Sequence, residues 1–178
     1  MRKIVLAALT TMLAAASIFT ATATANAAPY CGITWGSLPK SGGVMSTAPI
    51  TNIRTGQHDC YDRMVFDFSG SASGYRVQYV DNVYADPSGL LIPLKGGAKL
   101  QIVALAPTYN SSGVSTYPGV VGQPLPGVNL TGYQTFRDAK FAGSFEGQTT
   151  VGLGVRARLP FRVFTLDNRL VVDVAHHW

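Results

Sequence analysis

Histidine and carboxylate side chains are the first candidates for chemistry in this 178-residue sequence. They fall into two groups, His58 with Asp59 and Asp62, and His176 with His177. Neither group has the ligand number and spacing that are typical of a metal site, and adjacent histidines on a strand point to opposite faces. We expect the first group to cap a turn and the second to lie at a solvated chain end. The sequence therefore predicts no metal site.

Signatures of an enzyme are equally sparse. The run from Ser69 to Gly74 contains small residues but is not the Gly-x-Ser-x-Gly turn that presents a nucleophilic serine. Glycosidases need two carboxylates that face each other across a cleft. Nothing in the sequence brings Asp138 toward Glu146, the only glutamate, and Glu146-Gly147 equally suits a hairpin turn. We expect no catalytic residues and no cofactor, with a hydrolase as the enzyme class left open.

Arginine and aromatic side chains are better suited to binding. Arg156 and Arg158 share a strand face close to Arg162, where guanidinium groups could bind carboxylates or phosphates of a wall polymer. A solvated charged face is the alternative. Four further side chains join them as binding candidates through ring stacking or hydrogen bonding: Trp35, Tyr109, Tyr117 and His58.

The N-terminus has the three parts of a secretory signal. Arg2 and Lys3 precede an apolar stretch from Ile4 to Phe19, and Ala25-Asn26-Ala27 forms a small-x-small cleavage pattern. We expect residues 1–27 to be removed, which leaves no transmembrane segment. The sequence thus predicts a protein that is secreted, extracellular or associated with the cell wall.

Charge and cysteine content agree with export. Removal of Arg2 and Lys3 leaves twelve basic against nine acidic residues, a net charge of +3. This excess is too small to predict a nucleic-acid partner, although it would tolerate an acidic cell-surface polymer. Cys31 and Cys60 both follow the signal, and an oxidising compartment favours a disulfide between them. Trp35, beside Cys31, could pack on that bridge instead of binding a ligand.

Alternating apolar and polar residues predict an all-β domain, a sandwich or distorted barrel of about eight short strands. Residues 28–48, rich in Pro, Gly and Ser, predict an irregular arm and not a strand. The Pro/Gly-rich stretch from Pro107 to Gly132 predicts a long loop, either a binding element or a plain surface excursion. The expected strands cover residues 49–55, 63–69, 74–84, 98–105, 137–145, 148–156, 160–166 and 169–175.

One short pattern occurs twice. Arg63 and Asp67 in the first copy correspond to Arg169 and Asp173 in the second, and each pair stands about 13 Å apart on an extended strand. That distance is too long for an ion pair within a copy, so we expect structural pairing with neighbouring strands. The repeat would suit a sandwich assembled from two related halves. The copies are Arg63-Met64-Val65-Phe66-Asp67-Phe68 and Arg169-Leu170-Val171-Val172-Asp173-Val174.

A resemblance to a known family rests on residues 56–68, 74–80, 141–147, 152–155, 160–164 and 169–176. Together these segments resemble the AMIN-like domain of exported bacterial proteins. The resemblance covers about residues 49–176, and we place the domain at 49–178. It implies a β-sandwich, because related AMIN domains are β-sandwich modules that accompany cell-wall amidases and secretins and contact peptidoglycan.

The resemblance implies a non-catalytic module whose partner is a cell-wall polymer or an envelope protein. Peptidoglycan is the expected ligand, bound through the Pro107–Gly132 loop and nearby arginines. A secreted protein–protein interaction module, such as an inhibitor or an accessory subunit, is the alternative function.

Overall fold

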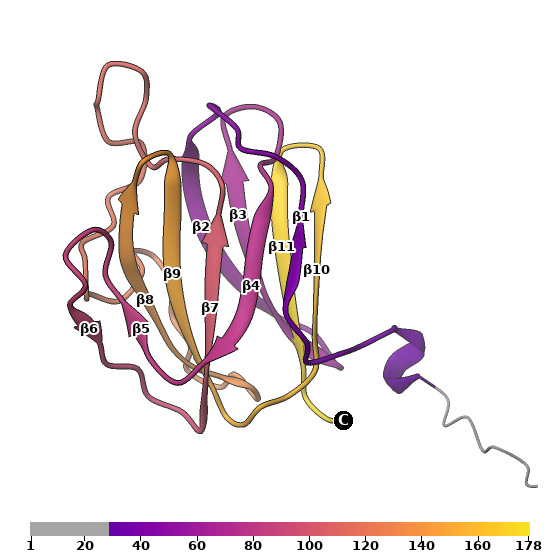
Figure 1. Cartoon of the computed structure of the whole chain (residues 1–178). Coiled ribbons are helices and arrows are strands. Elements are labelled where there is room, and N and C mark those ends of the chain that lie inside the picture. The colour runs from indigo at the N-terminus through magenta and orange to yellow at the C-terminus, as the bar shows by residue number, and fades with distance from the viewer. Residues whose placement is uncertain (1–28) are drawn as a thin grey trace, which may run out of the picture.

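Two antiparallel sheets pack face to face in the computed structural model, which describes residues 29–178 (Figure 1). The predicted signal lies outside the described residues. The five-stranded sheet has the order β1 (Lys40–Gly42), β4 (Tyr75–Val80), β7 (Ala98–Ala104), β9 (Gln148–Val155) and β8 (Phe136–Phe145). The four-stranded sheet has the order β10 (Phe161–Leu166), β11 (Arg169–Ala175), β3 (Tyr61–Phe68) and β2 (Ile50–Gln57). A small third sheet pairs β5 (Val83–Tyr84) with β6 (Leu91–Ile92).

The predicted fold class is confirmed as a β-sandwich, and no barrel closes. The expected strand over residues 74–84 is wrong, because the chain leaves the sheet at Asp81 and Asn82 and resumes as β5. Asp and Asn favour turns, which explains the break. Within the described part of the chain, helix is limited to the 3-10 turn η1 (Tyr30–Gly32), and no helix is long and apolar enough to cross a membrane.

The N-terminal arm is more regular than its composition predicts. Lys40 and Gly42 pair with Val77 and Tyr75 and so form β1 at the edge of β4. A three-residue strand is too short to show a hydrophobic period, and its pairing uses backbone groups that every residue offers. The interpretation of residues 28–48 as wholly irregular is therefore wrong.

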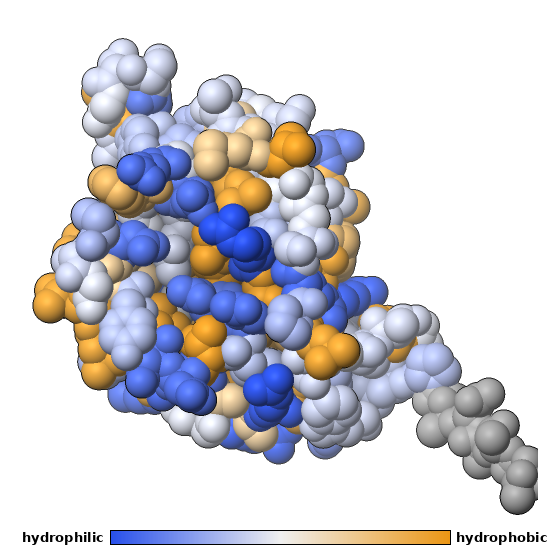
Figure 2. All heavy atoms as spheres, in the orientation of Figure 1, coloured by the Kyte–Doolittle hydropathy of each residue, from blue (hydrophilic) through white to orange (hydrophobic). Residues whose placement is uncertain are grey.

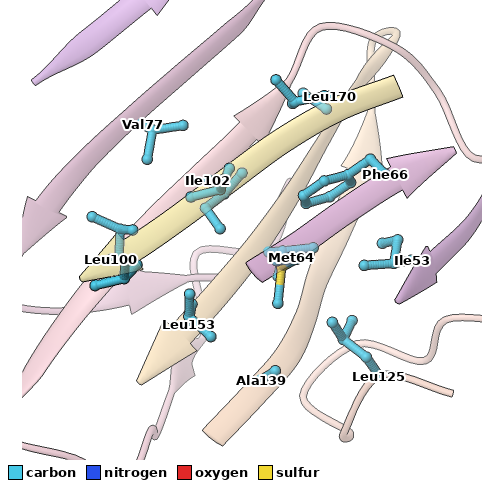
Figure 3. Close-up of a cluster of buried hydrophobic side chains, with 14 of the residues drawn as sticks. Ile53, Met64, Phe66, Val77, Leu100, Ile102, Leu125, Ala139, Leu153 and Leu170 are labelled. Atoms are coloured by element: carbon cyan, nitrogen blue, oxygen red, sulfur yellow. The ribbon is translucent and has the colours of Figure 1, made fainter. Parts of the chain in front are cut away.

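The core lies between the two sheets, where alternate side chains of each strand point inward (Figure 3). Met64 and Phe66 of β3 meet Leu100 and Ile102 of β7, with Leu153 of β9 beside them, and all five are fully buried. Burying side chains of this size stabilises the fold by about 1.5–3 kcal/mol each. The period of two in β3 predicts this inward face correctly.

The Pro107–Gly132 loop closes one side of the sandwich. Thr116 Oγ1 donates to the Ile50 carbonyl at the β2 edge, while the N–H groups of Gly122 and Leu125 donate to carbonyls of β8. Leu125 lies in the core. Prolines keep this segment from forming a regular strand, but it still covers the edges of both sheets. Only its tip, residues 110–115, stands clear of the body (Figure 1).

The β5–β6 ribbon packs on the outer face of the five-stranded sheet. Val83, Ala85 and Ile92 form a second apolar cluster there with Ala142 of β8. The segment that follows β6 approaches β9 closely, since a Cβ at Gly154 would lie 1.9 Å from the Lys95 carbonyl oxygen. Glycine is thus required in β9 to seat this segment.

Candidate functional site

The repeated Arg/Asp pattern forms an ion-pair ladder on the outer face of the four-stranded sheet. Its two copies lie in β3 and β11, which are antiparallel neighbours, so Arg63 stands opposite Asp173 and Arg169 opposite Asp67. Arg63 Nε lies 2.7 Å from Asp173 Oδ1, and Arg169 Nε lies 3.3 Å from Asp67 Oδ1. Antiparallel pairing makes the pattern self-complementary because each arginine meets the aspartate of the other copy. The copies therefore belong to one sheet, side by side.

Each aspartate of the ladder also binds an arginine from an outer strand. Arg162 of β10 places Nε 2.7 Å from Asp173 Oδ2, and Arg54 of β2 places Nε 2.8 Å from Asp67 Oδ2. Four arginines thus share two carboxylates, which leaves this face positively charged. The hydrogen bond between Arg63 and Asp173 raises the pKa of the Arg63 guanidinium above its usual value. The positive charge of Arg63 therefore persists at every physiological pH.

Three aromatic rings surround the Arg162 guanidinium. Its Cζ lies 5.5 Å from the ring centroid of Trp35, 5.2 Å from that of Tyr61 and 5.1 Å from that of Phe164. These distances lie within cation–π range. Arg63 faces two of the same rings, at 5.2 Å from Tyr61 and 5.6 Å from Phe164. We call this group the arginine–aromatic cluster: Trp35, Tyr61, Arg63, Arg162, Phe164 and Asp173.

The N-terminal arm supplies the tryptophan of the cluster. The predicted disulfide between Cys31 and Cys60 is confirmed, with a Cα–Cα distance of 6.4 Å. It fastens the arm beside the start of β3, and Trp35 Nε1 donates to the Tyr30 carbonyl at 2.8 Å. The indole ring then lies 5.9 Å from the Tyr61 ring. Trp35 thus forms part of a surface cluster through its contacts with Tyr30, Tyr61 and Arg162.

His58 joins the same surface through Tyr61. Its ring stacks on the Tyr61 ring, with 4.6 Å between centroids and an interplanar angle of 29°. The structure therefore brings Trp35, His58 and Arg162 together around Tyr61, a residue that the sequence had not singled out for binding. Tyr61 could have been identified from its place two residues before Arg63, on the outward face of β3.

The arginine–aromatic cluster can bind an acidic ligand that also has a flat apolar face. Arg162 uses Nε for Asp173, and within residues 29–178 its two terminal nitrogens have no hydrogen-bond partner. The Arg162 side chain is 30% exposed, so these donors can reach a carboxylate or phosphate from solvent. Trp35 and Tyr61 are both partly exposed, and such rings stack on other flat groups.

The loop tyrosines do not share this surface. Tyr117, expected from the sequence to be an exposed ring, is 3% exposed and lies 6.0 Å from the Phe141 ring. Burial raises the pKa of its phenol to about 12. Tyr109 accepts the Gly147 N–H at 3.1 Å, beside the turn between β8 and β9. The long loop covers apolar surface, which is why Tyr117 points inward.

Arg156 and Arg158 also lie away from the cluster. Arg156 donates to the His176 carbonyl at 2.5 Å, and the Arg158 guanidinium lies 5.0 Å from the Tyr79 ring centroid. Both arginines follow the C-terminal end of β9, whereas Tyr109 contacts Gly147, the residue that precedes the first residue of β9. The structure therefore does not bring Tyr109 of the loop together with Arg156 and Arg158.

A buried polar pair appears where the sequence suggested turn capping and a solvated end. Asp62 is fully buried and accepts the backbone N–H groups of Thr135 at 2.6 Å and Phe136 at 3.0 Å. His176 is 1% exposed and places Nε2 3.1 Å from Asp62 Oδ1. The inward period of β3 includes Asp62 as well as Met64, which is the signal that could have revealed its burial.

The two carboxylates considered for hydrolysis do not converge. Asp138 accepts the Lys95 N–H near the start of β8, whereas Glu146 lies in the exposed turn after β8. Eight residues of extended strand separate them by roughly 26 Å. Glu146 and Gly147 have φ angles of 48° and 74°, which are those of the predicted two-residue hairpin turn. A glycosidase site built on this pair is therefore excluded.

The fold, the disulfide and the charged aromatic surface define a class of protein, a disulfide-bonded antiparallel β-sandwich of the kind found in exported proteins. The AMIN-like domain model matches residues 48–176. The chain therefore belongs to the AMIN-like domain family, whose domains are cell-envelope modules and are generally non-catalytic. No curated protein and no solved structure matches the chain.

Proposed function

We propose that this protein is an exported, non-catalytic module that binds peptidoglycan through the arginine–aromatic cluster. In this proposal the signal covers residues 1–27, the arm covers 28–48 and the binding domain covers 49–178. Family membership and the disulfide support an envelope location. The arm is part of the binding unit because it contributes Trp35 to the cluster.

The observation that carries the proposal is the arrangement around Arg162. Asp173 fixes Nε of this side chain, and three rings surround the guanidinium, so its free terminal nitrogens are held in a defined place. Peptidoglycan combines sugar rings with free carboxylates of its stem peptides. A carboxylate would accept hydrogen bonds from Arg162 while a sugar ring stacks on Trp35 or Tyr61.

A pelleting assay with purified peptidoglycan tests this proposal. The processed chain, residues 28–178, should pellet at low salt and be released as salt screens the arginines. Arg162→Gln and Trp35→Ala should each reduce the bound fraction at least tenfold. Arg158→Gln is the matched control, because Arg158 also lies over an aromatic ring but outside the cluster. Circular dichroism melting should show that all variants fold.

Two results would overturn the proposal. One is a wild-type chain that stays in the supernatant at low salt, and the other is equal loss of binding in Arg158→Gln and Arg162→Gln. If no pelleting occurs but crosslinking recovers a discrete protein that Arg162→Gln loses, the protein–protein interaction module is the correct function.

A further inference from the structure

Two pairs of adjacent aliphatic residues are exposed side by side at the edge of the β5–β6 ribbon. Leu90 and Leu91 are 66% and 54% exposed, and Val120 and Val121 are 62% and 44% exposed. The segments that carry the pairs lie against each other, because a Cβ at Gly122, next to Val121, would lie 3.9 Å from Cδ1 of Ile92, next to Leu91. Apolar atoms gather along the margin of the molecule occupied by β5 and β6 (Figure 2). We call the four residues Leu90, Leu91, Val120 and Val121 the aliphatic edge.

Both pairs are held by structure beneath them. Ile92, next to Leu91, is buried in the cluster on which the ribbon packs. On the other segment, the Gln123 N–H donates to the Val120 carbonyl at 3.0 Å, and the Gly122 N–H donates to the Phe141 carbonyl at 2.8 Å. The side chains of the aliphatic edge are thus exposed on two segments whose backbones are held in place, and these side chains are not part of the core. Grouped exposed apolar side chains of this kind indicate a binding surface.

Positive charge lies directly beside the aliphatic edge. The hollow between the two segments is lined by Lys95, Lys140, Gln123 and Asp138. Asp138 uses its carboxylate to accept the Lys95 backbone N–H at 3.1 Å. Within residues 29–178 neither lysine ammonium has an ion-pair partner. Aliphatic tips bordered by unpaired lysines match a membrane surface, where apolar groups enter the acyl region and ammonium groups meet phosphates.

We propose that the aliphatic edge docks the exported domain on an anionic phospholipid bilayer. Leu90, Leu91, Val120 and Val121 enter the bilayer surface, while Lys95 and Lys140 bind headgroup phosphates. This function goes beyond peptidoglycan binding, because the aliphatic edge belongs to the ribbon on the five-stranded sheet and to the long loop beside it, whereas the arginine–aromatic cluster lies on the four-stranded sheet. The domain could therefore bridge membrane and wall.

A second copy of the chain is a poorer occupant. A stable protein interface buries about 800 Å² on each partner, which is more than four aliphatic side chains on two turns provide. A symmetric interface centred on this edge would also bring the lysines of both copies toward each other, and like charges at an interface oppose association. A lipid phosphate, in contrast, complements both lysines.

Vesicle flotation with the processed chain tests the membrane proposal. Binding to vesicles of equal phosphatidylglycerol and phosphatidylcholine should be at least tenfold stronger than binding to pure phosphatidylcholine. The double variants Leu90→Ser/Leu91→Ser and Val120→Ser/Val121→Ser should each lose at least tenfold. Lys95→Gln/Lys140→Gln should remove the preference for phosphatidylglycerol. Val44→Ser is the matched control, since Val44 is 80% exposed but lies in the arm.

Three results would overturn the proposal: no flotation with phosphatidylglycerol vesicles, serine variants that float like Val44→Ser, or a dimer in sedimentation that the serine variants dissociate. Leu91→Trp adds a third tryptophan to Trp35 and Trp178, and with these vesicles its emission should shift to shorter wavelength by more than that of the wild-type chain. The serine variants should still pellet with peptidoglycan, so failure of membrane docking is distinguishable from failure of wall binding.

Discussion

Replacing Asp62 by alanine should be among the most destabilising single changes on this domain. The carboxylate is fully buried and has three polar partners. It accepts the backbone N–H groups of Thr135 and Phe136, both buried, and it contacts the His176 ring. Alanine leaves two backbone N–H groups without an acceptor, and each orphaned group costs about 1–3 kcal/mol. With the loss of the His176 contact, we expect a total of about 4 kcal/mol.

Asparagine at the same position should cost much less. Both backbone donors bind the same carboxylate oxygen, Asp62 Oδ2, and an asparagine oxygen can take that place. The amide NH₂ of Asp62→Asn can then donate to His176 Nε2 when that nitrogen is unprotonated. We expect a loss of about 1–2 kcal/mol from the weaker neutral hydrogen bonds.

Urea unfolding followed by circular dichroism measures both effects. With a slope of about 2 kcal/mol per M, a loss of 4 kcal/mol lowers the midpoint by about 2 M. Asp59→Ala is the control, because Asp59 is exposed three residues earlier, and it should change stability by less than about 0.5 kcal/mol. A loss below about 1 kcal/mol in Asp62→Ala, or equal losses in the alanine and asparagine variants, would refute this account of the buried carboxylate.

Four further outcomes follow from the same contacts. Opening the disulfide between Cys31 and Cys60, which are 29 residues apart, should cost about 3.6 kcal/mol on the chain-entropy model; thermal unfolding of Cys31→Ser/Cys60→Ser measures it, and an unchanged melting temperature would contradict it. Tyr117→Phe should leave stability unchanged or raise it by about 1 kcal/mol, because the Tyr117 hydroxyl is buried and has no partner in the described structure. Tyr79→Phe should lose about 1–3 kcal/mol in the same urea assay, because the Tyr79 hydroxyl both donates to Leu159 at 2.6 Å and accepts from it at 3.1 Å. Burial raises the pKa of Tyr79 and of Tyr117 from 10.0 to about 12. The unfolded chain therefore ionises these phenols first, so the free energy of unfolding is independent of them below pH 10 and declines as pH rises toward 12. The free energy of unfolding, measured at several pH values in this range, should fall as pH rises. Tyr79→Phe/Tyr117→Phe should make this fall shallower, and an identical pH profile in the double variant would contradict the prediction.

Local pattern in the sequence was sufficient for the longer strands and for the face that β3 buries, although it missed β1 and the break after β4. The alternation from Met64 to Phe68 predicted an inward face of β3, and the structure buries it as expected. Export chemistry and two cysteines were enough to predict the disulfide. These features depend on neighbouring residues or on compartment, so they can be deduced without knowing which strands meet.

The sequence by itself therefore determined a disulfide-bonded β-sandwich of the AMIN-like family, together with the Arg/Asp repeat that marks two of its strands. Only the tertiary structure decided that these strands are neighbours and that Trp35 and Phe164 meet around Arg162. It also decided that Tyr117 and His176 are buried while Leu90 and Val120 are exposed. Pairing between distant strands and coverage by a long loop set these outcomes, and neither leaves a period in the local sequence.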